Sequence, residues 1–256
     1  MIDFNRVWRW FGTAFSFFLF GLGGLLLTCL VFPLLAIYPM KEKGVKQQRM
    51  QKTVQLCFRL FIKCMSSLGV LSYEIIDADK LKDAKLILAN HPSLLDVVFL
   101  ISLVPNACCV VKGRLTKNIF LRGPIKAAGY IINSDSNTLI AASKESMSLG
   151  NALIIFPEGT RTTADSDLVF KRGAANIAIR CEAPVTPVVI KCTPTTLTKN
   201  DRWYQVPNKK VHFRIQVNEQ LPIDYLSADI AVSKKVRQFN SDLKKYYTKE
   251  LLKHEQ

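Results

Sequence analysis

A short polar cluster interrupts the apolar stretch LILANHPSLLDVVFLISLV, residues 86–104. In it, Asp96 follows His91 by five positions, and His91 is one of only three histidines in the chain. A carboxylate that bonds one imidazole nitrogen fixes the tautomer and leaves the other nitrogen to take a proton from a hydroxyl. Ser93 lacks the spacing of a nucleophile, so this interpretation is a general base that activates a substrate hydroxyl. Alternatively, His91 caps a helix that begins at Pro92, and Asp96, just over one turn in, interacts with the helix dipole.

A second polar cluster, FPEGTR at residues 156–161, follows another apolar run. Gly159 permits close approach of the backbone, Glu158 can orient a hydroxyl, and Arg161 carries a planar fork of donors suited to phosphate. Lys171, at the start of a predicted helix, offers a second contact for an anion. The alternatives are an ordinary turn with a surface ion pair for the cluster and a solvated helix cap for Lys171.

Short runs rich in β-branched residues alternate with helical patterns beyond residue 70, which predicts an α/β fold with a mostly parallel central sheet flanked by helices. Ligands bind such sheets at the carboxyl ends of strands, and both polar clusters follow predicted strands. A charged helix at about 230–253 is expected to be a solvated outer element, and Pro187 indicates a sheet edge or a bulge. The predicted strands are 85–90, 106–112, 129–133, 152–157, 185–191 and 211–217, and the predicted helices are 93–104, 115–127, 137–150 and 172–182.

The amino-terminal segment is predicted to enter a membrane. No charged residue occurs from Trp10 to Met40, a run longer than the roughly 20 residues that cross the hydrocarbon layer as a helix. Its glycines and prolines are compatible with a straight span, a kinked span or a re-entrant helix pair. The run is too long for a cleaved signal peptide and has no small-x-small cleavage site.

The residues that flank this run predict its orientation. Arg6 and Arg9 precede it, whereas five basic residues follow it, so the positive-inside rule places the rest of the chain in the cytoplasm. We expect the membrane to be a bacterial-type inner membrane. Trp8, Trp10 and Tyr38 suit the two membrane interfaces. The five basic residues are Lys41, Lys43, Lys46, Arg49 and Lys52.

Residues 45–68 form a predicted amphipathic helix with basic residues on its other faces. The helix either lies on an anionic membrane or packs on the domain that follows. We therefore divide the chain into a membrane segment with this helix, residues 1–68, and an α/β domain, residues 69–256. The apolar residues of the helix, at three- and four-residue spacing, are Met50, Val54, Cys57, Phe61, Met65 and Leu68.

The composition favours an anionic membrane surface over nucleic acid as the partner. The chain has 35 Lys and Arg against 20 Asp and Glu, a formal net charge of +15, and 49% hydrophobic residues. Aromatic residues do not interleave with basic ones in a nucleic-acid-binding signature. The seven cysteines form no CxxC pair and no metal-ligand spacing, so we expect reduced thiols and no metal site.

Taken together, these stretches make the chain resemble the glycerolipid acyltransferases, that is, the lysophospholipid or 1-acylglycerol-3-phosphate acyltransferases. The His-x4-Asp motif of that family matches His91 and Asp96, and FPEGTR is a full match to its third motif. The stretch VTPVVI at 185–190 is similar to its fourth motif. The resemblance covers residues 70–215, and a membrane-bound amino terminus is also typical of the family.

This resemblance implies transfer of an acyl group from an acyl-CoA or acyl carrier protein thioester to a lipid hydroxyl, foremost that of 1-acylglycerol 3-phosphate. The membrane supplies the lipid, and no metal or organic cofactor is implied. In this scheme His91 is the catalytic base and Asp96 orients it. The implied acceptor-binding residues are Glu158, Gly159, Thr160, Arg161 and Lys171.

One motif departs from the family pattern. The stretch GYIINSDS has Asn133 and Ser134 where the second motif usually has an arginine that would bind acceptor phosphate. Either Arg161, Lys171 or Lys112 replaces it, or the acceptor lacks a glycerol phosphate head, as in specialised lipid or aryl-polyene pathways. A hydrolase or transacylase with the same base, and an inactive membrane scaffold, are the remaining alternatives.

Overall fold

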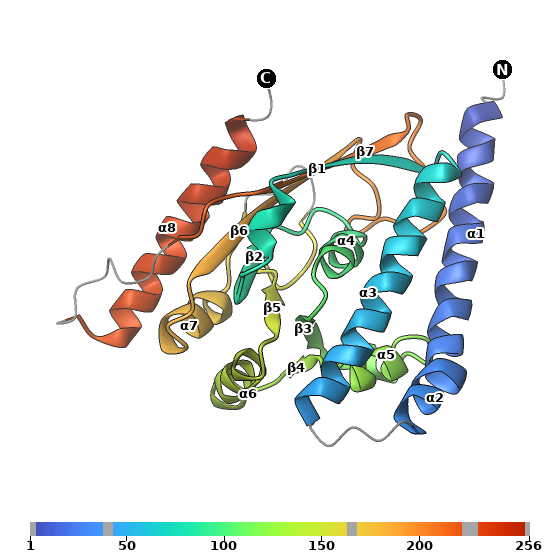
Figure 1. Ribbon diagram of the computed structural model, residues 1–256. Coiled ribbons are helices and arrows are strands. Elements are labelled where there is room, and N and C mark those ends of the chain that lie inside the picture. Colours follow the sequence, from blue (N-terminus) through green and yellow to red (C-terminus); the bar gives the residue numbers. More distant parts are fainter. Residues whose placement is uncertain (1–3, 38–42, 163–167, 222–229, 254–256) are drawn as a thin grey trace.

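The computed structural model describes residues 4–37, 43–162, 168–221 and 230–253. Its strands form one sheet in the order β1-β7-β6-β2-β5-β3-β4, with helices on both faces (Figure 1). Strands β2 to β6 run parallel, β7 is antiparallel to β6, and β1 pairs with β7 in parallel. The predicted α/β fold with a mostly parallel sheet is therefore confirmed. The strands are β1 (Leu71–Ile76), β2 (Leu86–Ala89), β3 (Ala107–Lys112), β4 (Ile131–Asn133), β5 (Ala152–Ile155), β6 (Val185–Thr193) and β7 (Val211–Val217).

Two hydrophobic cores lie on opposite faces of the sheet because strand side chains alternate in direction. In β2, for example, Ile87 belongs to the core shared with α3 and α4, whereas Leu88 belongs to the core shared with α7 and α8. The helices are α1 (Phe4–Leu26), α2 (Phe32–Ile37), α3 (Lys43–Ser67), α4 (Asp96–Leu103), α5 (Arg122–Ala127), α6 (Ser136–Ser148), α7 (Arg172–Arg180) and α8 (Val232–Lys253), with the short helices η1 (Leu27–Val31), η2 (Ala78–Leu81) and η3 (Gly113–Lys117).

Three details differ from the prediction. The helix expected at 115–127 is divided into η3 and α5. Helix α8 is not a purely solvated element, because it buries one face against β6 and α7, including Phe239 and Tyr247. Pro187 lies in the central strand β6 rather than at an edge, and its carbonyl accepts the N–H of Asn218 just beyond the regular pairing with β7.

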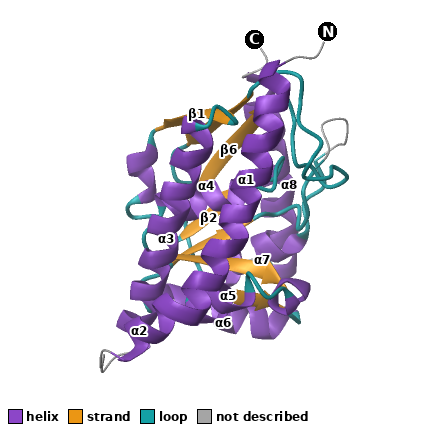
Figure 2. Ribbon diagram, turned by 90° about the vertical axis from the view of Figure 1, so that its right-hand side faces the viewer, coloured by secondary structure: helices purple, strands orange, loops and turns teal. Residues whose placement is uncertain are grey.

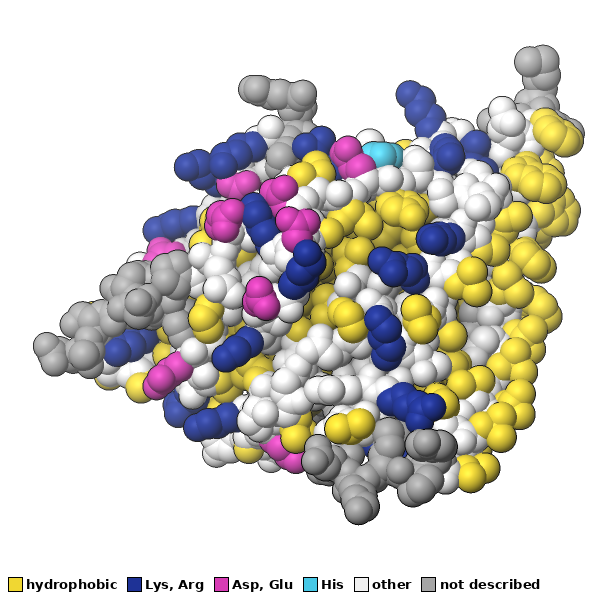
Figure 3. Space-filling model, in the orientation of Figure 1, with side chains coloured by type: hydrophobic (Ala, Val, Ile, Leu, Met, Phe, Trp, Pro, Cys, Tyr) yellow, Lys and Arg dark blue, Asp and Glu magenta, His cyan; other side chains and the backbone are white. Residues whose placement is uncertain are grey.

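The amino-terminal segment forms one continuous helix, Phe4–Ile37, which is long and apolar enough to cross a membrane. Figure 2 shows α1 beside α3 on the same side of the molecule. The ring of Phe20 stacks on Phe58 of α3, and the indole N–H of Trp8 donates to the carbonyl of Leu68. The outer face of α1 exposes a row of large apolar side chains, seen at the right of Figure 3. This helix suggests membrane association.

One flanking residue, Arg9, differs from the expectation. Arg9 is buried and contacts the domain, so it is not a flanking charge that simply faces water. Tyr38 and Lys41 lie outside the described residues.

Helix α3 packs on the domain with one face, where Met50, Val54 and Met65 are buried. Cys57, expected on that face, is exposed instead. A row of basic side chains covers the outer face of α3 (Figure 3). The structure thus shows the packing of one face on the domain, and contact of the basic face with a membrane stays a prediction. The exposed basic residues are Lys46, Arg49, Lys52, Arg59 and Lys63.

Candidate active site

The strand order brings both polar clusters to one edge of the sheet, because β2 and β5 are neighbours and both end there. The Nδ1 atom of His91 lies 2.9 Å from Oδ2 of Asp96. The same oxygen accepts a hydrogen bond of 2.7 Å from the N–H of Ser93. Asp96 is fully buried, whereas the side chain of His91 is 14% exposed. The two residues therefore form a dyad in which the carboxylate holds one ring nitrogen.

The alternative role of His91 as a helix cap does not fit the local structure. Helix α4 begins at Asp96, its N-cap residue is Leu95, and no side chain caps it. Residues 92–95 form a turn instead of the first helical turn. The dyad thus spans a strand-to-helix connection, with Asp96 at the very start of the helix.

Burial raises the pKa of Asp96, and the hydrogen bonds from His91 and Ser93 oppose that effect. The second oxygen of the carboxyl, Oδ1, has no hydrogen-bond partner among the described residues. When the other ring nitrogen takes a proton from a substrate, an ionised carboxylate at Nδ1 stabilises the positive charge that forms on the ring. Such a charge is what a general base acquires during the reaction.

Glu158 contacts the main chain of His91. Its Oε1 accepts the N–H of His91 at 2.9 Å, and the residue is 4% exposed. Burial raises the pKa of Glu158 to about 8, with the His91 N–H opposing and the charge of Asp96 adding to the rise. The sequence predicted an acceptor contact for Glu158, whereas the contact that the structure shows is one that positions His91.

The FPEGTR turn favours glycine at position 159 because of its backbone conformation, and this position lies against the flexible side chain of Lys171. Gly159 has φ +65°, a conformation that side chains disfavour, and its N–H donates to the carbonyl of Phe156 at 2.9 Å. A Cβ atom there would also lie 3.1 Å from Cδ and 3.4 Å from Nζ of Lys171. Lys171 is itself tied to the turn, because its N–H donates to the carbonyl of Pro157. The fold thus brings Lys171 next to Gly159.

Five cationic side chains gather around this turn. Burial lowers the pKa of Lys112, and the charges of Arg114, Lys171, Lys199 and Arg161 lower it further. Arg161, whose Nη1 donates to the carbonyl of Leu197 at 2.7 Å, also has its pKa lowered, by burial and by Arg114. Like charges at this density repel one another, and a bound anion removes that repulsion. The cluster of Lys112, Arg114, Arg161, Lys171 and Lys199, called the cation cluster below, is therefore suited to an anionic ligand.

The position without the usual arginine lies beside this cluster. Asn133 is exposed and pairs with Lys112 in the register of β3 and β4. Thr160, the remaining predicted residue, is partly exposed between Gly159 and Arg161. Lys112 on the adjacent strand β3 thus lies next to Asn133, where the family usually has an arginine.

Some residues of the site were not predicted. Asn90 binds both the N–H and the carbonyl of Ile190 at 2.7 Å, which ties the end of β2 to β6. The ring of Phe156 stacks on the imidazole of His91 with centroids 4.1 Å apart. Asn90 and Phe156 adjoin the motifs and could have been found from that position. Arg114 and Lys199 gave no such signal, because only the folded chain brings them to Lys112.

Residues 73–191 match the model of the Acyltransferase family. The chain is 28% identical over 180 residues to the human protein named 1-acyl-sn-glycerol-3-phosphate acyltransferase beta, covering 66% of this chain and 62% of the human one. It is 35% identical over 114 residues to the 1-acyl-sn-glycerol-3-phosphate acyltransferase of Helicobacter pylori, covering 42% of this chain and 48% of that protein. The matches thus span less than two thirds of the length of either relative.

A crystal structure with a similar fold is that of the 1-acyl-sn-glycerophosphate acyltransferase PlsC from Thermotoga maritima. The TM-score is 0.69 at 18% identity, and the superposition covers 96% of this chain and 97% of that one. At this identity the likeness concerns the fold, including the long apolar amino-terminal helix. The family match and the shared fold confirm the resemblance predicted from the motifs.

Proposed function

Because the chain is an acyltransferase homologous to the 1-acyl-sn-glycerol-3-phosphate acyltransferases, we propose that it acylates the free hydroxyl of 1-acylglycerol 3-phosphate. The donor is the thioester of acyl-CoA or of an acyl carrier protein. One observation carries the proposal: the His91–Asp96 dyad, at 2.9 Å, lies at the same sheet edge as the cation cluster. A base next to an anion-binding surface suits a lipid that has both a hydroxyl and a phosphate.

The dyad performs the proton transfers. The Nε2 atom of His91 takes the proton of the acceptor hydroxyl while its oxygen attacks the thioester carbonyl carbon. The tetrahedral intermediate then collapses, the C–S bond breaks, and the leaving sulfur takes the proton from His91. Asp96 holds Nδ1–H and stabilises the imidazolium between these two steps. The ester formed is lower in energy than the thioester, so the donor drives the reaction.

The acceptor phosphate binds in the cation cluster. Arg161 and Lys171 approach it from the FPEGTR turn, where Gly159 and Thr160 leave the backbone accessible. Lys112 supplies a charge beside Asn133, in place of the arginine that the second motif lacks. Glu158 contributes by holding the backbone of His91.

A second candidate acceptor follows from Asn133. An exposed amide at this position binds a neutral hydroxyl or carbonyl group as readily as a phosphate. The alternative is therefore an acyltransferase of a specialised lipid pathway whose acceptor has no glycerol phosphate head.

The protein acts at a membrane through α1 and the basic face of α3. We place the site on the cytoplasmic face of a bacterial-type inner membrane, because acyl thioesters are made in the cytoplasm. The apolar row on α1 adjoins hydrocarbon, and the neighbouring cations of α3 lie at the level of anionic headgroups.

Thiol release by purified protein tests this function. Acyl-CoA and acyl carrier protein donors are each offered with lysophosphatidic acid, glycerol 3-phosphate or an uncharged lipid alcohol, using wild type and His91→Ala. His91-dependent release with lysophosphatidic acid supports the proposal. Thiol release only with the uncharged lipid alcohol supports an acyltransferase of a specialised lipid pathway. Free fatty acid as the product indicates a hydrolase. No thiol release with any donor and acceptor favours a membrane scaffold.

A further inference from the structure

Residues 194–210, called the β6–β7 loop below, connect the candidate site with the amino-terminal helix. At the site, the carbonyl of Leu197 accepts two hydrogen bonds. One comes from Nη1 of Arg161 at 2.7 Å, and the other from the N–H of Leu94 at 3.1 Å. Leu94 belongs to the turn between His91 and Asp96. The position of the loop therefore affects the main cation of the FPEGTR turn and the turn of the dyad together.

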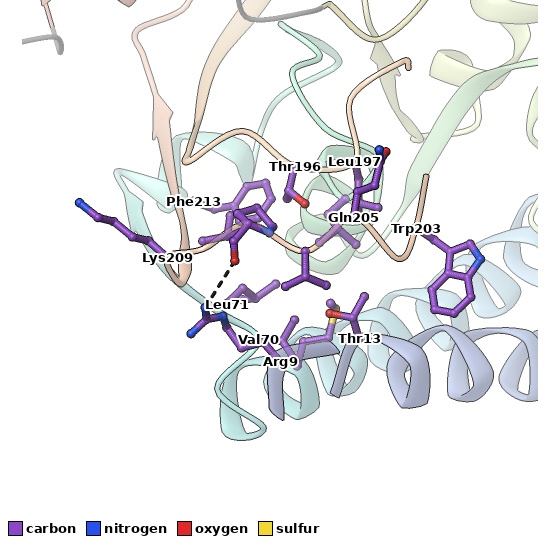
Figure 4. A pocket seen from close by; sticks show the side chains of 15 residues that line it. Arg9, Thr13, Val70, Leu71, Thr196, Leu197, Trp203, Gln205, Lys209 and Phe213 are labelled. Atoms are coloured by element: carbon purple, nitrogen blue, oxygen red, sulfur yellow. Dashed lines mark hydrogen bonds between the residues drawn. The ribbon is translucent and has the colours of Figure 1, made fainter. Parts of the chain in front are cut away.

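At its other end, the loop is held by α1. The Nη2 atom of Arg9 donates to the carbonyl of Asn208 at 2.6 Å and to that of Pro207 at 3.4 Å. The indole of Trp203 contacts the rings of Trp10 and Phe17, with centroids 6.3 and 6.1 Å apart. Figure 4 shows Arg9 pointing from α1 toward the loop, with a dashed line along its hydrogen bond.

The surroundings of Arg9 indicate a structural contact and not a ligand site. Arg9 is 8% exposed, and the pocket that it lines with Thr13 and Trp203 has a volume of about 20 Å³. That is room for about one water molecule. A buried guanidinium is costly unless carbonyls or charges satisfy it, so the loop carbonyls fix where this side chain, and hence the loop, can lie.

We propose that Arg9 is a positioning residue for acceptor binding. By fastening the β6–β7 loop to α1, it holds the carbonyl of Leu197, and through that carbonyl the guanidinium of Arg161, in the geometry that binds the acceptor phosphate. This inference rests on the proposed function. It also means that the helix that enters the membrane is mechanically connected to the binding site.

Steady-state kinetics test the proposal with Arg9→Met, Arg9→Lys and, as a matched loss of an exposed charge on α8, Arg237→Met. We expect Arg9→Met to raise the KM for lysophosphatidic acid about tenfold, with the KM for the acyl donor changed less than twofold and kcat changed less than the acceptor KM. Arg9→Lys keeps a cationic donor and should recover part of the loss. An unchanged acceptor KM, or a fall in kcat with both KM values constant, overturns the proposal.

Amide hydrogen exchange provides a readout that needs no activity. The peptide that contains Leu94 should exchange faster in Arg9→Met than in wild type, because the Leu197 carbonyl is no longer held in place, and should not change in Arg237→Met. Trp203→Ala loosens the loop from its other contact and should have the same effect, which covers the case that Arg9→Met does not fold. Equal exchange in all variants overturns the inference.

Absence of acyl transfer by wild type would instead refute the proposed function, and the exchange data would still decide whether Arg9 fastens the loop.

Discussion

Two carboxyl groups contact the proposed base at different atoms. Asp96 bonds the ring at Nδ1, whereas Glu158 bonds the main-chain N–H. Burial raises the pKa of both groups. Substitutions of the two residues should still have different effects. Asp96 affects the charge of the imidazole, whereas Glu158 affects the position of the His91 backbone.

We expect substitutions of His91 and Asp96 to lower kcat by different amounts. His91→Ala removes the proton acceptor and should lower kcat by about 10³- to 10⁴-fold, whereas Asp96→Ala leaves the base in place and should cost on the order of 10²-fold. Initial rates of thiol release measure both, with circular dichroism as the check on folding. Near-normal turnover in His91→Ala would refute the mechanism. A loss in folded Asp96→Ala that equals or exceeds that of His91→Ala would mean that the two roles are misassigned.

Glu158 makes a prediction about pH and stability. Its pKa rises from 4.5 to about 8 on folding, so between these values the unfolded chain has released a proton that the folded protein keeps. The contribution of Glu158 to the free energy of unfolding is therefore complete below pH 4.5 and decreases as the pH rises toward 8. At about 1.4 kcal/mol per pH unit, the decrease is up to about 5 kcal/mol.

The neutral variant Glu158→Gln keeps the acceptor for the His91 N–H but does not titrate. Its thermal midpoint in detergent, relative to wild type, should therefore increase between pH 5 and pH 8. Glu219→Gln, which alters a carboxyl whose side chain is 85% exposed, serves as the control and should follow wild type. Parallel pH profiles for wild type and Glu158→Gln would contradict a buried neutral carboxyl.

At the scale of elements, α8 supports the strand that leads to the base. The hydroxyl of Tyr247, which is fully buried, donates to the carbonyl of Leu88 in β2, three residues before His91. The ring also packs edge-on against Phe170, just before α7. One tyrosine of α8 thus contacts two segments that adjoin the site.

Tyr247→Phe should lower the free energy of unfolding by about 1–2 kcal/mol, because the ring stays in place while a buried hydrogen bond is lost. The matched control is Tyr204→Phe, whose hydroxyl is near the surface and contacts Arg202. Thermal unfolding in detergent, followed by tryptophan fluorescence, measures the difference. If Tyr247→Phe and Tyr204→Phe have equal midpoints, the Tyr247 hydroxyl does not fasten α8 to β2.

The sequence predicted six strands well because each is a short apolar run bounded by polar residues. It missed β1, because LSYEII mixes half-buried polar positions with apolar ones and follows a long helical pattern. It placed Asp96 one turn inside a helix, since Pro92 is a common first helical residue, whereas the turn at 92–95 is closed by the Ser93 N–H bond to Asp96. The sequence could not predict contacts between residues far apart in the chain. Examples are the charge interaction of Lys199 with Lys112 and the hydrogen bond from Arg9 to Asn208.

At the scale of the whole molecule, two distant surfaces of the described residues carry rows of positive charge in addition to the cation cluster of the site. One is the outer face of α3, next to the apolar row of α1, and the other is α8 on the opposite side (Figure 1, Figure 3). Only the first adjoins a surface that hydrocarbon can cover. If the molecule sits on the membrane through α1 and α3, equal changes of net charge on the two surfaces should have unequal effects on lipid binding.

The triple variant with Lys52, Arg59 and Lys63 changed to Gln tests this asymmetry. Each basic residue near an anionic lipid surface contributes about 1 kcal/mol, so the variant should need on the order of 100-fold more phosphatidylglycerol for the same stabilisation. The control changes Lys234, Lys244 and Lys249 of α8 to Gln, which alters the net charge equally and leaves the cation cluster of the site intact. The measurement is the thermal midpoint in mild detergent as phosphatidylglycerol is added, with phosphatidylcholine as the neutral comparison. Equal losses in the two variants would show that lipid binding follows net charge alone, and a larger loss in the α8 variant would place the membrane on the opposite face.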